Sequence, residues 1–149
     1  MRSRSPVVLA IAGGIFVVAV LGGIIFANTR SEWVAPPETR EQKNPVPANE
    51  ASIAAGKAIF MDKCVNCHGE KGDGEGSEAD MYDVKPADFA NPAIVKETDG
   101  ELFWKITTGR KPMPSFKSKL SEDERWQAID FIRTFMAAQQ TPAPAPAPK

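Results

Sequence analysis

Cys64-Val65-Asn66-Cys67-His68 is the stretch that decides the fold of this 149-residue chain, because it holds both of the cysteines and the single histidine. Two thiols separated by two residues and followed at once by an imidazole form the pattern at which a c-type haem is attached. The thiols can reach two vinyl groups on one porphyrin edge, and His68 then lies under the iron as the proximal ligand. Since no other Cys or His remains, the chain offers no second covalent haem, no bis-histidine ligation and too few ligands for a structural zinc site, which takes about four.

The same Cys-x-x-Cys spacing also occurs in thioredoxin-like redox pairs. That fold requires a strand leading into the motif within a βαβ unit. The residues before Cys64 resemble instead the polar end of a helix, Phe60-Met61-Asp62-Lys63. The context therefore favours haem attachment over a dithiol redox site.

Residues 51–140 are predicted to form a small all-α domain around the haem, since no alternating strand pattern is present. A helix over residues 51–63 would deliver the cysteines, and a shorter helix is predicted over residues 101–107. The last helix is predicted to begin at Ser121, with Glu124 completing a capping box. Its apolar residues recur at helical spacing, namely Trp126, Ile129, Ile132, Phe135 and Met136. About 90 residues bury little apolar surface alone, so the haem would supply part of the core.

The sixth iron ligand has to come from elsewhere, and methionine is the leading candidate type, with lysine or open coordination as the alternatives. Met113 is the predicted distal ligand, because prolines on both of its sides oppose helix and stiffen the loop Gly109-Arg110-Lys111-Pro112-Met113-Pro114-Ser115-Phe116. A rigid loop presents a side chain at low entropic cost. Met81 is a second possibility, whereas Met61 precedes the cysteines and Met136 belongs to the apolar face of the last helix. A methionine merely packed under the loop is the other interpretation of Met113.

At these residues the sequence resembles the class I cytochromes c, above all the short bacterial domains of cbb3-type oxidase subunits and related electron carriers. The resemblance covers residues 51–135 and rests on Cys64-Val65-Asn66-Cys67-His68-Gly69, Lys85-Pro86-Ala87-Asp88-Phe89, Gly109-x-x-x-Met113-Pro114-x-Phe116 and the final aromatic helix. It implies an all-α fold wrapped around one covalent haem. It also implies that Gly56 and Phe60 pack on the last helix, with Ala128 and Phe131 as partners. Finally, it implies that a proline carbonyl holds the proximal imidazole Nδ1–H, and Pro86 is the best match.

An uncharged, mostly apolar run covers residues 7–27, VVLAIAGGIFVVAVLGGIIFA. Its length matches the roughly 20 residues that a helix needs to cross a bilayer and exceeds the h-region of a cleaved signal, about 7–15 residues. A single uncleaved transmembrane anchor is therefore predicted, with a cleaved signal as the alternative. Arg2 and Arg4 precede the run, so the positive-inside rule places residues 1–6 in the cytoplasm and the haem domain on the periplasmic side of the inner membrane.

Two segments outside the predicted domain are rich in proline. Residues 28–50 are polar, contain Pro36, Pro37, Pro45 and Pro47, and are predicted to form an extended linker that spans about 3 Å per residue. Residues 141–149, TPAPAPAPK, are predicted to form a polyproline II tail without a core. The tail is interpreted as an unstructured end, with a docking strand as the alternative.

Charged residues are unevenly placed along the predicted domain. Basic residues cluster near the Met113 loop, whereas acidic residues follow the haem motif: Arg110, Lys111, Lys117 and Lys119 against Glu70, Asp73, Glu75, Glu78 and Asp80. A basic rim beside the haem edge could steer acidic partners, and an ordinary solvated surface is the equally weighted alternative. The formal net charge of -1 gives no support to nucleic-acid binding.

The resulting prediction is a membrane-anchored, single-haem cytochrome c that carries single electrons between respiratory or photosynthetic complexes and is not an enzyme. Redox proteins or a membrane complex are the expected partners. The first alternative is a fixed haem c subunit of a larger membrane oxidoreductase. A second, from another class, is a haem-based sensor or ligand binder with an open sixth position.

Overall fold

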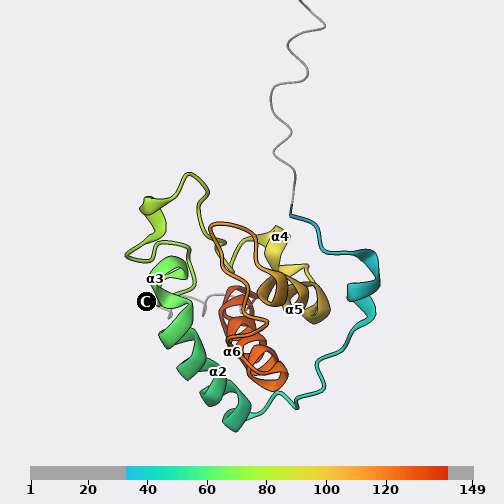
Figure 1. The fold of residues 1–149 in the computed structure, drawn as a ribbon. Coiled ribbons are helices and arrows are strands. Elements are labelled where there is room, and N and C mark those ends of the chain that lie inside the picture. Colours follow the sequence, from blue (N-terminus) through green and yellow to red (C-terminus); the bar gives the residue numbers. More distant parts are fainter. Residues whose placement is uncertain (1–32, 141–149) are drawn as a thin grey trace, which may run out of the picture. The chain divides into compact units, whose positions relative to one another are not determined.

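The computed structural model describes residues 33–140, and this part of the chain is helical, with no β-strand (Figure 1). The helical elements, in chain order, are η1 (Pro37–Glu41), α2 (Glu50–Lys63), α3 (Val65–His68), η2 (Ala79–Met81), α4 (Pro92–Val95), α5 (Asp99–Thr108) and α6 (Glu122–Gln140). The all-α prediction is therefore confirmed for the described part. Residues 35–140 lie within one compact unit.

The predicted membrane span over residues 7–27, the cytoplasmic residues 1–6 and the tail over residues 141–149 lie outside the described residues. Among the helices of residues 33–140, none has the length and apolar character needed to cross a bilayer.

Each of the three longer helices begins at a side-chain cap that the local sequence provides. Asn49 and Ser52 form a reciprocal capping box at the start of α2, and Thr98 and Glu101 do the same for α5. At the start of α6, Ser121 N donates to Glu124 Oε2 at 2.7 Å, and Glu124 N donates to Ser121 Oγ at 3.2 Å. These bonds satisfy backbone N–H groups that have no partner within the helix, and the predicted capping box at Ser121 is confirmed.

Helices α2 and α6 cross in close contact at Gly56. A Cβ atom at Gly56 would lie 1.9 Å from the carbonyl oxygen of Gln127 and 3.0 Å from Cβ of Phe131. One turn further along α2, the Phe60 and Phe131 rings pack with their centroids 5.3 Å apart. Phe131 is thus a packing partner of α2, as the resemblance implied. The closest approach to Gly56 is made by the backbone of Gln127. Ala128, the other partner that the resemblance implied, is the next residue and is buried.

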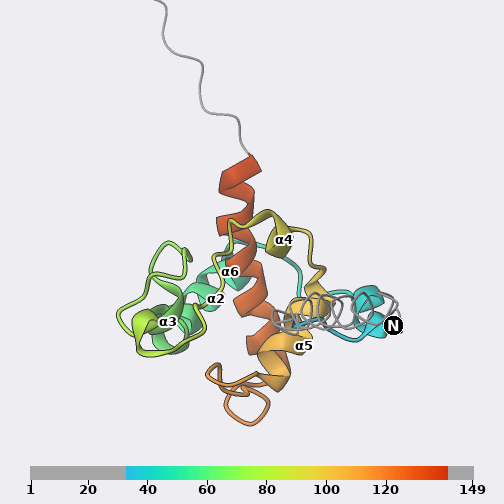
Figure 2. The ribbon, with the colours of Figure 1, turned by 90° about the horizontal axis from the view of Figure 1, so that it is seen from above.

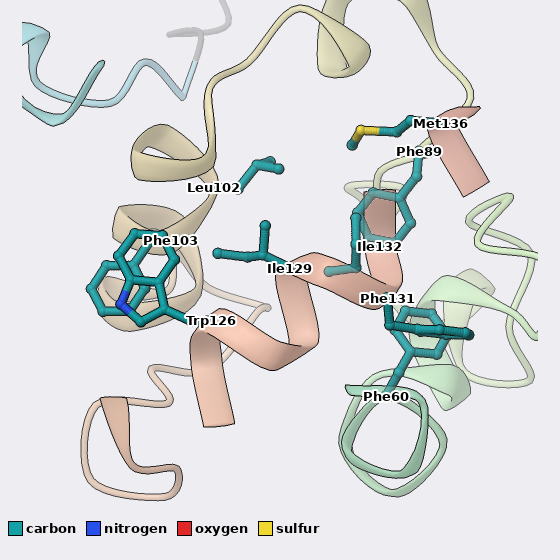
Figure 3. Close-up of a cluster of buried hydrophobic side chains, with 9 residues drawn as sticks. All are labelled: Phe60, Phe89, Leu102, Phe103, Trp126, Ile129, Phe131, Ile132 and Met136. Atoms are coloured by element: carbon teal, nitrogen blue, oxygen red, sulfur yellow. The ribbon is translucent and has the colours of Figure 1, made fainter. Parts of the chain in front are cut away.

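The apolar core gathers side chains from α2, α5 and α6 and from the chain that follows α3, as Figure 3 shows. Trp126 stacks on Phe103 with ring centroids 3.9 Å apart and so joins α6 to α5. The buried members of this cluster are Phe60, Phe89, Leu102, Phe103, Trp126, Ile129, Phe131, Ile132 and Met136. Burial of large aromatic and branched side chains of this kind is the main stabilising term in a domain of this size.

Residues 35–49, called the N-terminal strap below, differ from the extended linker predicted over residues 28–50. Ala35 and Thr39 are buried, and Arg40 Nε donates to Glu101 Oε1 at 2.9 Å. Figures 1 and 2 both show η1, drawn in cyan, lying beside α5. The strap packs so closely because α5 carries Gly100 at this point, where a Cβ would lie 1.9 Å from Thr39 O.

The strap is also tied to α6 by a partly buried hydrogen bond. Asn44 Nδ2 donates to Asp130 Oδ1 at 2.7 Å, and the Asn44 side chain in turn accepts from Val46 N. Burial raises the pKa of Asp130, a hydrogen bond with Ser52 acts in the opposite direction, and the nearby charge of Asp99 raises it further. A buried carboxyl group therefore holds the strap, although burial disfavours its negatively charged form.

Asp130→Asn is expected to become more stable relative to the wild type as the pH rises. Because the folded-state pKa of Asp130 is raised, its contribution to stability is complete below the ordinary value of 3.8 and is lost as the pH rises through the folded-state pKa. Asn keeps an oxygen for Asn44 and carries no charge at any pH. Urea unfolding of both proteins at about pH 4 and about pH 7, followed by circular dichroism, measures the difference.

Asp130→Ala is the matched control, since it removes the acceptor oxygen and leaves the half-buried Asn44 amide with only the longer contact to Trp126 O at 3.4 Å. It is expected to lose about 1–3 kcal/mol of unfolding free energy. A stability gap between Asp130→Asn and the wild type that does not grow with pH would contradict the burial of a disfavoured carboxylate.

Candidate haem-binding site

The cysteine motif occupies a single helical turn at the end of α2. Cys64 closes α2 through a hydrogen bond from its N–H to Phe60 O (2.9 Å), and its carbonyl accepts from His68 N (2.9 Å). Because residues three and four positions apart share one face of a helix, Cys64, Cys67 and His68 lie on the same side of this turn. Two thiols and an imidazole on one face are the arrangement that covalent attachment and proximal ligation require.

Both thiols are free, and their surroundings disfavour thiolate. Burial, followed by the charges of Cys67 and Asp62, raises the pKa of Cys64 to about 12. The pKa of Cys67 is also raised, by burial first and then by the charge of Glu78. Reactive dithiol sites work with lowered thiol pKa values, and no strand leads into the motif in the part of the chain that the structure describes. Both observations argue against a thioredoxin-like pair.

His68 is held through its Nδ1 atom, which lies 3.1 Å from the carbonyl oxygen of Ala87. This geometry identifies Nδ1 as the protonated nitrogen, so that Nε2 carries the lone pair that a metal needs. Burial lowers the pKa of His68, while the Ala87 carbonyl acts in the opposite direction. Burial therefore favours the neutral imidazole, and a backbone carbonyl fixes its tautomer, as is usual for metal-bound histidine.

The carbonyl that accepts from His68 Nδ1 belongs to Ala87. The resemblance had pointed to Pro86, the residue before Ala87, so that expectation is corrected. The loop between His68 and this point varies in length, so the resemblance did not determine which residue provides the carbonyl. In the structure Phe89 N donates to Gly72 O at 2.8 Å, and this bond fixes where the chain passes the imidazole. Pro86 O points instead toward Gly74, where a Cβ would lie 2.7 Å away.

Phe89 is a supporting residue whose role the sequence reasoning did not identify, although its motif had been singled out. Its ring stacks on the imidazole of His68, with centroids 4.8 Å apart and planes 20° apart. It also meets Phe60 edge-on with ring centroids 6.2 Å apart, which connects it to the crossing of α2 and α6. The proximal histidine is therefore fixed by a carbonyl at its edge and by a buried ring against its face.

The loop that carries Met113 is non-helical, as the two prolines predicted, and it is anchored to the end of α5. Phe116 N donates to Ile106 O at 3.1 Å, and Ser115 Oγ donates to Thr107 O at 2.7 Å. The Phe116 side chain is buried beneath the loop. These contacts hold the loop directly after Pro114, and Met113 itself is half-buried.

The other methionines of residues 33–140 have surroundings unlike those of Met113. Met136 is buried in the core, where Arg133 Nη1 contacts its sulfur at 2.9 Å. Met61 and Met81 are 40% and 70% exposed. Within the described chain, Met113 alone combines partial burial with a position on a fixed loop, which keeps it the leading distal candidate.

The donor set fits a covalently bound haem and not a bare metal ion. Two protonated thiols suit addition to vinyl groups, and a neutral imidazole suits iron. By contrast, residues 33–140 contain no group of three or more His, Cys, Asp or Glu side chains placed to hold a metal ion directly. Cys64 and Cys67 would carry the porphyrin, and His68 would bind its iron.

The helical fold and the Cys-Cys-His turn define a c-type cytochrome domain. The chain matches the family described as cytochrome c oxidase, cbb3-type, subunit III, over residues 51–132, and it belongs to that family. Membership implies covalently bound haem c and a role in electron transfer. The strap, residues 35–49, lies before the matched residues.

Among solved structures, the chain is similar to a component of the Kuenenia stuttgartiensis reducing HAO-like protein complex Kustc0457/Kustc0458. The sequences are 33% identical, the TM-score is 0.55, and the match covers 61% of this chain. It covers 46% of the other chain, so the present protein spans about half the length of that relative. No curated protein sequence matches the chain.

Proposed function

We propose that this protein is a membrane-anchored, single-haem cytochrome c that transfers one electron at a time and catalyses no reaction of its own. The observation that carries the proposal is the hydrogen bond between His68 Nδ1 and Ala87 O at 3.1 Å, beside two free thiols on the same helical turn. That combination prepares an imidazole for iron and two sulfurs for the porphyrin. Haem c, when bound, supplies the Fe(II)/Fe(III) couple.

The residues around the site have separate tasks in this proposal. Cys64 and Cys67 hold the porphyrin by thioether bonds, and His68 is the proximal ligand, oriented by Ala87 and Phe89. Met113 is the distal ligand, presented by its anchored loop. If His68 and Met113 both held the iron, no position would remain for a substrate, and the haem would supply electron transfer alone.

The proposal is tested by producing the chain together with a cytochrome c maturation system. One haem per chain is expected, resistant to acid–acetone extraction, with a reversible one-electron redox titration. Cys67→Ala should leave one vinyl group unreacted and shift the pyridine haemochrome band accordingly, whereas Met61→Ala should leave it unchanged. A haem that extracts freely from the wild-type protein would overturn the proposal.

The strap changes the expected reach of the haem domain. If residues 7–27 span the inner membrane with the domain on the periplasmic side, only residues 28–34 join the span to the packed part of the chain. At about 3.3–3.6 Å per residue, these residues extend to at most about 25 Å, far less than residues 28–50 would. A short tether favours a partner that is itself bound to the membrane.

This short reach gives specific support to a second candidate, a fixed haem c subunit of a membrane oxidoreductase complex. The family is described as an oxidase subunit, and the similar solved chain belongs to a protein complex. Purification in mild detergent distinguishes the two forms. If the protein purifies in a stoichiometric complex, it is a subunit. If it is extracted from the membrane without other proteins, it is a carrier between respiratory or photosynthetic complexes.

A further inference from the structure

The loop after α3 exposes three apolar side chains within four residues. Met81, Tyr82 and Val84, called the apolar tip below, are 70%, 41% and 46% exposed. Single exposed apolar residues are common on protein surfaces, but a group of them on one projecting loop is a typical feature of interaction sites. In Figures 1 and 2 this loop, drawn in yellow-green, extends outward beside α3 and away from α6.

The segment that leads into the apolar tip is bonded to the turn that carries the cysteines. Gly76 N donates to Cys67 O at 3.2 Å, and Glu78 N donates to Asn66 O at 2.7 Å. The Asn66 side chain closes the contact by donating to Glu78 Oε1 at 3.2 Å. Ala79, the first residue of η2, is buried. The tip therefore follows a segment that is bonded to the turn whose cysteines would hold the porphyrin.

The surroundings of the apolar tip are strongly acidic. Residues 70–88 hold seven acidic side chains, Glu70, Asp73, Glu75, Glu78, Asp80, Asp83 and Asp88, against two basic ones, Lys71 and Lys85, which gives a net charge of -5 (2 − 7). One of the two lysines is engaged internally, since Lys85 Nζ lies 2.9 Å from Glu75 Oε1. The basic residues Arg110, Lys111, Lys117 and Lys119 belong to a different loop. The acidic residues that follow the haem motif in sequence thus surround the apolar tip, and the basic cluster lies on the Met113 loop.

We propose that the apolar tip and its acidic surroundings are the docking surface for a redox protein whose own docking face is an apolar centre ringed by Lys and Arg. This inference rests on the proposed function and adds the chemistry of its partner. An anionic lipid surface would be repelled by the same charges, which excludes the membrane as the occupant. One electron passes from haem Fe(II) to the oxidised one-electron centre of the partner, and no proton or bond is exchanged.

The surface can be tested without the natural partner, by using two small oxidants of opposite charge. Tris(phenanthroline)cobalt(III) is a cation with an apolar aromatic exterior, so it reproduces the chemistry expected of the partner, whereas hexacyanoferrate(III) is a polar anion. Stopped-flow oxidation of the ferrous protein is measured with each at about 10 mM and about 100 mM salt, where the Debye length falls from about 30 Å to about 10 Å. The cobalt rate is expected to fall severalfold with salt and the hexacyanoferrate rate to rise.

Two double variants separate the charge from the apolar contact. Asp80→Asn with Asp83→Asn is expected to lower the cobalt rate about threefold at low salt and to have little effect at high salt. Met81→Ser with Val84→Ser is expected to lower it about twofold at both salt concentrations. Lys117→Gln with Lys119→Gln is the matched control on the other loop, and its cobalt rate should not fall.

The outcomes distinguish this inference from the proposed function on which it rests. Failure of the chain to bind haem, or to titrate as a one-electron couple, would remove the proposed function itself. An intact haem spectrum and an unchanged reduction potential, combined with cobalt rates equal to the wild type in both tip variants, would overturn the docking surface alone. The same conclusion would follow if the control variant slowed the cobalt reaction as much as the tip variants do.

Discussion

Met113→Ala is expected to abolish the ferric methionine–iron charge-transfer absorption and to lower the reduction potential by on the order of 0.1 V. A thioether ligand favours the ferrous state and raises the potential of a c-type haem, and axial ligands set haem potentials over a range of about 0.8 V. The loop that carries Met113 is fixed at Phe116 and Ser115 by hydrogen bonds to α5. Alanine at position 113 therefore removes the ligand while leaving the loop in place.

The matched control is Met81→Ala, because Met81 was the other possible ligand and is 70% exposed. Absorption spectra of the oxidised proteins and potentiometric titration of both variants give the answer. Retention of the charge-transfer band in Met113→Ala would show that the ligand assignment is wrong. Absence of the band in the wild-type protein would instead support the sensor or ligand-binder alternative, which needs an open or weakly held sixth position.

The parts of the fold that sequence could predict are those set by short-range chemistry. The cysteine motif located the site because two thiols and an imidazole at this spacing have few other uses. The capping residues at Ser121 and the two prolines around Met113 act on their own neighbours, so their effect on the backbone does not depend on the rest of the fold. The contact of Gly56 with the last helix was given by the resemblance and not by periodicity.

The parts that sequence could not predict depend on contacts between distant segments. The strap looks like a polar linker because it packs through a backbone carbonyl over Gly100 and through the side chains of Arg40 and Asn44. None of these contacts produces an apolar period. Likewise, the carbonyl that holds His68 belongs to Ala87 and not to Pro86, because the length of the intervening loop decides which residue passes the imidazole.

Correcting the strap also changes how the site relates to its partner. A haem domain on a long linker would sample many orientations, so its docking surface alone would have to distinguish the correct partner from other proteins. If the proposed anchor is present, a domain packed up to Ala35 has a tether of only a few residues. A partner bound to the same membrane is then held at a high effective concentration near the domain. The docking proposed for the apolar tip would then act on a partner that is already held near the domain.

Gly56→Ala is expected to destabilise the folded domain by about 3 kcal/mol or more, at the upper end of what overpacking costs. In an exposed helix the same change would add about 1 kcal/mol of stability, because Ala has the higher helix propensity. At this position the new Cβ would lie 1.9 Å from the Gln127 carbonyl oxygen and 3.0 Å from Phe131 Cβ. Neither atom is the end of a flexible side chain, so α2 and α6 have to separate, and the Phe60–Phe131 contact opens with them.

Guanidinium unfolding of the haem-loaded protein, followed by circular dichroism, measures the loss. Lys57→Ala is the control, since it changes the next residue on the exposed side of the same turn and should alter the unfolding free energy by no more than about 0.5 kcal/mol. A loss below about 1 kcal/mol in Gly56→Ala would mean that the two helices can move apart without cost. In that case the crossing at Gly56 would not be what fixes Phe60, Phe89 and, through them, the imidazole of His68.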